Sequence, residues 1–165
     1  MPTLDGTVRR SMKAFLEYIR SKEWTGRENE AISLYAFGFL QRECRKRGLL
    51  NDSTQIAIEV GAADLPKKSP HSQIRKDLVI WRQPGSNRWY PAGQRSEPLA
   101  IMEWKVCRSG FRSGSSNEAD VNWLRNHCKH HPMTVGYAIW LDLRRPPAQL
   151  CVTRIDCEGV RQLAC

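Results

Sequence analysis

The sequence predicts an α/β domain in which a central mixed β-sheet of about five strands is flanked by helices. Apolar residues recur at helical spacing in the first third of the chain. Short strand-like runs separated by turn residues occupy the middle. An almost unbroken apolar strand at residues 134–143 follows a further helix, as expected when both faces of a sheet are covered. With 165 residues, the chain fits a single domain at 1–165.

Two helices open the predicted order. An amphipathic helix is expected at about residues 6–22 because its apolar residues share one face. These residues are Val8, Met12, Phe15, Leu16 and Ile19. A second helix is expected from Arg27 to Arg47, with a basic end and Gly48 as its stop. Its middle, at 31–40, is apolar on nearly every side, which predicts a centrally buried helix.

Three strands, a helix and two strands complete the order. The three strands are expected at residues 55–60, 76–81 and 99–107. Ser116 or Asn117 can cap the next helix, since acidic Glu118 and Asp120 follow in its first turn and Pro132 closes it. The last two strands are expected at 134–143 and at 150–155, the latter as an edge strand.

The charge of the chain favours an anionic partner. There are 26 Lys and Arg against 17 Asp and Glu, which gives a formal charge of +9. Nucleic acid is the partner that such a balance suggests, and membrane-surface binding is the competing interpretation. Neither a spanning apolar run nor a signal-peptide pattern is evident, so we expect a cytoplasmic protein that makes no use of a membrane. Six scattered cysteines indicate reduced thiols rather than disulfides.

Ionised residues interrupt two of the apolar strands. Asp77 lies in one of them, and Glu103 and Lys105 lie in the other. Because burying an unpaired charge is costly, these groups are expected to have partners or a chemical role. Side chains alternate along a strand, so Glu103 and Lys105 share one face. Met102, Trp104 and Val106 point to the other face. The alternative is a structural salt bridge across neighbouring strands.

This pattern resembles the PD-(D/E)XK nuclease superfamily, also called restriction-endonuclease-like. The resemblance consists of Asp77 on one strand, Glu103-x-Lys105 on the next, and the order of elements over about residues 27–155. It implies a restriction-endonuclease-like core and a metal-dependent endonuclease that hydrolyses DNA phosphodiester bonds with Mg²⁺ or Mn²⁺. The chain departs from the family pattern by carrying Lys76 where the motif has proline, and by the 26 positions between Asp77 and Glu103.

The resemblance also implies a role for each site residue. Asp77 and Glu103 would bind the metal together with the backbone carbonyl of Trp104. Lys105 would orient or activate the attacking water and stabilise the charged transition state. An early helix usually adds a glutamate, and here either Glu28 or Glu30 could serve. The sequence does not separate these two glutamates.

Basic residues flank the proposed site in the sequence and are natural phosphate contacts. They are Lys67, Lys68, Arg75, Lys76, Arg108 and Arg112. The long link between the two motif strands adds further cations and aromatic rings, which either contact DNA or belong to a solvated loop. They are Arg82, Arg88, Trp89, Tyr90 and Arg95.

Potential zinc ligands crowd one helix end, at His127, Cys128, His130 and His131. Structural zinc sites use spaced pairs on separate elements, so a polar helix end with histidines near the negative pole of the helix dipole is the favoured interpretation. Two alternatives to a nuclease remain open: a non-catalytic nucleic-acid-binding module with the same fold, and a basic scaffold in which the charged residues form an ion-pair network. A homodimer is compatible with the nuclease interpretation.

Overall fold

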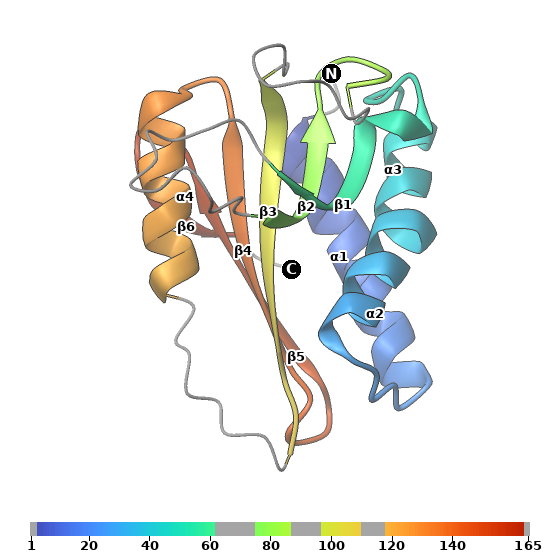
Figure 1. The fold of residues 1–165 in the computed structure, drawn as a ribbon. Helices are drawn as coiled ribbons and strands as arrows, with labels where there is room; N and C mark the ends of the chain where they lie inside the picture. The colour runs from blue at the N-terminus through green and yellow to red at the C-terminus, as the bar shows by residue number, and fades with distance from the viewer. Residues whose placement is uncertain (1–2, 62–74, 87–96, 110–117, 164–165) are drawn as a thin grey trace.

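The computed structural model describes residues 3–61, 75–86, 97–109 and 118–163. These residues form a six-stranded mixed sheet with helices on both faces (Figure 1). The α/β class and the flanked mixed sheet are therefore confirmed, with one strand more than the five expected. Within these ranges no helix is both long enough and apolar enough to cross a membrane.

The N-terminal helices lie together on one face of the sheet (Figure 1). Helix α1 (Leu4–Ser21) begins where the Thr3 hydroxyl accepts the Gly6 N–H, a typical N-cap. The predicted second helix is one continuous rod whose middle is π-helical. It consists of α2 (Glu28–Ser33), the π segment η1 (Leu34–Leu40) and α3 (Gln41–Lys46). The rod ends before Gly48, whose positive φ of 63° suits glycine.

The strands follow one another across the sheet in chain order. They are β1 (Ile56–Gly61), β2 (Arg75–Trp81), β3 (Pro98–Cys107), β4 (Val135–Asp142), β5 (Gln149–Ile155) and β6 (Val160–Leu163). Neighbours are antiparallel except β3 and β4, and α4 (Glu118–His130) lies in the crossover that a parallel pair needs. Strand β5 was expected at the edge, but β6 pairs with it and takes that place.

Two apolar cores of unequal size hold the sheet between its helices. The larger core joins α1 and the α2–α3 rod to the sheet, with Phe15 packed edge-on against Tyr35, Phe39 and Trp104. The smaller core lies under α4 and includes Leu124 and residues of four strands. Trp104 is buried toward α1, so the alternation predicted along β3 is confirmed and its charged residues face α4.

Candidate active site

The site lies where β2 separates from β3. The antiparallel register of the two strands ends at the pair Leu78 and Met102, whereas β3 stays paired with β4 as far as Cys107. The last half of β3 therefore has an edge with no strand beside it among the described residues. Backbone N–H groups on such an edge need acceptors.

Two carboxylates supply those acceptors. The N–H of Trp104 donates to Oδ2 of Asp77 at 2.7 Å. The N–H of Val106 donates to Oε2 of Glu28 at 2.9 Å. In a strand, the N–H and C=O of one residue point to the same side, so the Trp104 carbonyl faces this edge as well. Residues far apart in the sequence thus meet at the open edge of β3.

Lys105 occupies the centre of an acidic group. Its Nζ lies 4.0 Å from Oε1 of Glu28 and 3.8 Å from Oδ2 of Asp120, and its side chain is 32% exposed. That oxygen of Asp120 is buried and accepts no hydrogen bond within the described residues. Lys105 is thus held between α2 and α4 and remains reachable from solvent.

Glu103 has a different partner. Its carboxylate pairs with the Nζ of Lys76, and both residues are nearly buried, at 6% and 5% exposure. The same ammonium lies 3.3 Å from the centroid of the Trp123 ring, a cation–π contact. Lys76 was expected to contact phosphate, but here its charge is directed inward and is already compensated by Glu103.

Burial and crowding of like charges alter two carboxyl groups. Burial raises the pKa of Glu103, and Asp77 and Asp120 add to the rise against the opposing effect of Lys76. Burial likewise raises the pKa of Glu28, against the Val106 N–H and Lys105, with Asp77 and Asp120 again adding to it. Burial disfavours charge of either sign, whereas the crowding of carboxylates is a cause that a nearby cation would relieve.

The structure separates the two candidate glutamates of the early helix. Glu28 reaches the edge of β3, as described above. Glu30 instead turns back to the start of its own helix, where its Oε2 accepts the N–H of Arg27 at 2.6 Å. Glu30 therefore caps α2 and does not belong to the site, which corrects one half of that expectation.

The other predicted phosphate contacts are only partly described. Arg75 is exposed at the beginning of β2, and Arg108 is half-buried just after β3. Both flank the strands that carry the site. Three further basic residues lie outside the described residues, namely Lys67, Lys68 and Arg112.

Asp120 and Trp123 are the site residues that sequence reasoning missed. The sequence marks Asp120 only as an acid in the first turn of its helix. It stands four residues before Leu124 and eight before Cys128, both buried against the sheet, so it belongs to the stripe of α4 that faces β3 and β4. That spacing is the signal that could have placed it.

Histidines at the end of α4 pack as rings among the described residues. Across the described residues, no group of three or more His, Cys, Asp or Glu side chains is arranged to hold a metal ion. The His127 ring stacks instead between Trp123 and His131, with ring centroids 4.9 Å and 4.4 Å apart. His127 is fully buried, so it lies in the packed interior and not at the polar helix end predicted from the sequence.

Comparison with known proteins adds no relative. No family model matches the sequence, and the searches of curated proteins and of solved structures give no significant match. Evidence for a function therefore comes from the chemistry of the site.

Proposed function

We propose that the protein is a metal-dependent nuclease that hydrolyses phosphodiester bonds of DNA. The observation that carries the proposal is the approach of Glu28 and Asp120 to Lys105 at the open edge of β3. Asp77 holds the same edge through Trp104, and Glu103 lies near enough for Asp77 and Asp120 to raise its pKa. A formal charge of +9 on the whole chain contrasts with this acidic cluster. A basic protein with a local group of carboxylates suits a nucleic-acid substrate and a cation that joins it to the protein.

The ligand chemistry of the site fits Mg²⁺ or Mn²⁺, which prefer oxygen donors. Asp77, Glu103 and the carbonyl of Trp104 would hold the ion, which would neutralise charge on the phosphate and activate water. Mg²⁺ usually keeps several waters and takes only one or two carboxylates from the protein. A site without three convergent carboxylates is therefore compatible with such an ion.

Lys105 is the residue that we assign to the reaction itself. Its ammonium can orient water at the scissile phosphate and stabilise the negative charge that develops there. Glu28 and Asp120 position this ammonium from two sides. Glu28 also holds the β3 edge through Val106, so it couples the strand to the helix rod.

A second candidate is a nucleic-acid-binding module without catalysis. It is favoured by one observation: Asp77, Glu28 and Glu103 each already have a hydrogen-bond donor or an ammonium as partner. In such a module the carboxylates would be structural groups. Binding of DNA without cleavage under any metal condition would support it.

The test is cleavage of supercoiled plasmid and of branched and single-stranded oligonucleotides with Mg²⁺, Mn²⁺ or EDTA. Asp77→Asn keeps an acceptor for Trp104 but removes the charge, and Lys105→Ala removes the ammonium. We expect each to lower the cleavage rate by at least about 100-fold. Glu17→Gln and Lys13→Ala, at exposed positions of α1, are the matched controls and should cut normally.

Calorimetric titration with Mg²⁺ and Mn²⁺ separates the remaining outcomes. Metal binding that Asp77→Asn abolishes, together with metal-dependent cleavage, is the expected result. Absence of both cleavage and Asp77-dependent metal binding would overturn the proposal. Indifference to metal and to nucleic acid alike would indicate the basic scaffold.

A further inference from the structure

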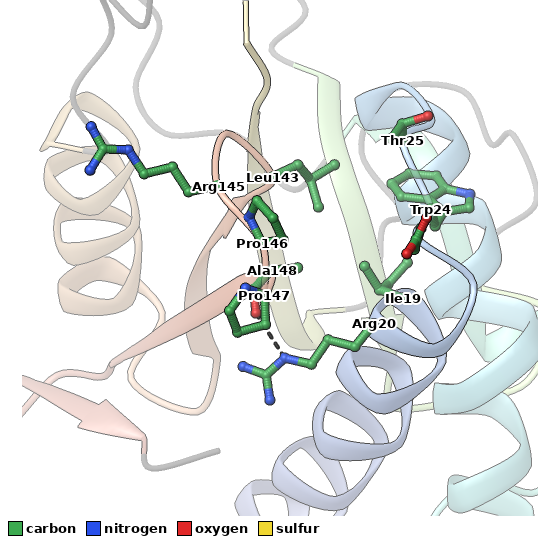
Figure 2. Close-up of a pocket in the computed structure, with 10 residues that line it drawn as sticks. Ile19, Arg20, Trp24, Thr25, Leu143, Arg145, Pro146, Pro147 and Ala148 are labelled. Carbon is green, nitrogen blue, oxygen red and sulfur yellow. Dashed lines mark hydrogen bonds between the residues drawn. The ribbon is translucent and has the colours of Figure 1, made fainter.

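A groove lies beside the proposed site, between the end of α1 and the loop that joins β4 to β5. Its volume is about 480 Å³, within the range of about 300–1,000 Å³ typical of small-ligand sites. Figure 2 shows Trp24 and Thr25 on one side of it and the loop with Pro146 and Pro147 on the other, with Ile19 between them. The lining is mostly apolar, and an indole ring forms part of one wall.

The wall that carries Trp24 is fixed by its local structure. Glu23 has a positive φ of 48°, and the N–H of Trp24 donates back to the Ile19 carbonyl at 3.1 Å, which ends α1. A side chain at Gly26 would collide with the Trp24 indole, so glycine is required for this close packing. The indole is therefore held in place before any ligand arrives.

The opposite wall is held by an arginine. The Nε of Arg20 donates to the carbonyl of Ala148 at 2.9 Å, drawn as the dashed line in Figure 2. Arg145 lies at the rim and points away from the groove toward solvent (Figure 2). Neither arginine forms an ion pair with any described residue. Among the described residues that line the groove, Glu23 is the one with a carboxylate. The rim thus favours an anion next to an apolar ligand.

Two short connections place the groove close to the site. Thr25 precedes Glu28 by three residues, a span of at most about 11 Å. On the other side, the N–H of Leu143 donates to the carbonyl of Cys107 at 2.8 Å, and Cys107 is two residues beyond Lys105. A strand with one phosphate at Lys105 can therefore reach the groove within a few nucleotides.

We infer that this groove binds one unstacked nucleobase of the nucleic-acid strand, with its ring on Trp24, its own phosphate near Arg20, and the adjoining backbone outside the groove near Arg145. The inference rests on the proposed function, since the strand bound here is the one that would be cut. A flat ring that carries a phosphate matches an aromatic wall with cations at its rim. The site would favour single-stranded or distorted substrates, in which bases are free to leave the stack.

Fluorescence anisotropy with labelled single-stranded oligonucleotides in EDTA tests the inference without cleavage. We expect Trp24→Leu to weaken binding by about 5- to 150-fold, the range for loss of one base–aromatic stack. Phe37→Leu, at a side chain that is 48% exposed and outside the groove, should bind as the wild type does. Arg145→Gln should lower the slope of log affinity against log salt by about 0.7.

An oligonucleotide with one abasic position supplies the second measurement. When that position coincides with the groove, the wild type should lose affinity and Trp24→Leu should lose no more. Equal binding by Trp24→Leu and wild type to intact and abasic strands would overturn the inference. So would a change in sedimentation of Trp24→Leu without a change in affinity, because the groove would then join two copies of the chain.

Cleavage assays keep this inference distinct from the proposed function. If the wild type and Trp24→Leu cut DNA equally well, the role of the groove in binding a base would be refuted and the proposed nuclease activity would be supported. A protein that binds through Trp24 but never cuts with any metal would refute the nuclease and support the groove as a nucleic-acid site.

Discussion

The two faces of the sheet differ in how completely their polar groups are satisfied. On the face covered by α1 and the α2–α3 rod, four aromatic rings pack edge to face, and the hydroxyls of Ser11 and Tyr35 share a hydrogen bond of 2.9 Å. On the α4 face, polar and charged groups are buried among fewer apolar residues. Buried side-chain atoms without a hydrogen bond among the described residues include only the Trp104 indole nitrogen on the first face, and atoms of Trp81, Asp120, Trp123 and His127 on the second.

This contrast indicates that the two faces contribute differently to stability and to function. Burial of apolar surface is the main source of folding free energy, and it is concentrated under α1 and the rod. Unsatisfied buried polar groups cost stability, and a buried ion pair is often no more stabilising than an apolar pair in its place. Departures from an apolar core are expected at functional sites. The α4 face would then carry function at the expense of stability, and variants on the two faces should behave differently.

The largest effect is expected from Phe15→Ala. This fully buried ring contacts three other aromatic rings, so its removal leaves a cavity in the larger core. The free energy of unfolding should fall by about 3–5 kcal/mol, as measured by urea denaturation. Phe37→Ala, on an exposed ring, should change it by less than about 0.5 kcal/mol. A cost below about 1 kcal/mol for Phe15→Ala would mean that this face does not dominate stability.

A smaller effect is expected from Lys76→Met on the other face. The substitution leaves Glu103 buried without its ammonium, and breaking a buried pair costs about 3–5 kcal/mol. We expect about 3 kcal/mol at pH 8, because Glu103 can limit the loss by taking up a proton. The pKa of Glu103 is already raised by burial, so the deficit should shrink as the pH falls and the carboxyl becomes neutral. Urea denaturation at pH 5 and pH 8 measures both quantities.

The double variant Lys76→Met/Glu103→Met is the control for this argument. Replacing both members of a buried pair by apolar residues is often close to neutral. The double variant should therefore regain most of the stability lost in the single one, and its stability should depend less on pH. A double variant as unstable as the single one would show that Lys76 acts through packing on Trp123 and not through its charge.

The sequence predicts the elements of this fold well because their periodicities are strong. The apolar spacing in α1 and the apolar run of β4 are enough to predict which of their residues are buried. The short strand β6 has mostly exposed residues and only Leu163 buried, so no alternation marks it. Its formation depends on the pairing edge that β5 offers, which is a tertiary effect.

The sequence predicts the orientation of a site residue when it depends only on that residue's own strand. It predicts less well which residue of another element the side chain contacts. The shared face of Glu103 and Lys105 follows from period two. The partners of these two residues cannot be deduced from that period. Glu103 pairs with Lys76, whereas Lys105 lies near Glu28 and Asp120. These contacts form because α2 and α4 approach β3 from opposite sides. The choice between carboxylates depends on helix placement, which sequence spacing leaves open.

The smallest of these effects concerns His127, which is buried with both ring nitrogens lacking a hydrogen bond among the described residues. Burial, with the nearby charges of His131, Lys76 and His130, lowers its pKa to about 4. A lowered histidine pKa gives stability above pH 6.5 that is lost as the pH falls toward 4.

His127→Phe keeps the stack on Trp123 but cannot take up a proton. Its stability relative to wild type should therefore be about 2 kcal/mol more favourable at pH 5 than at pH 8 in urea denaturation. His130→Gln, exposed on the same helix, should show no such difference. If both variants follow the wild type at the two pH values, His127 does not resist protonation, and the α4 face is less costly than its unpaired groups indicate.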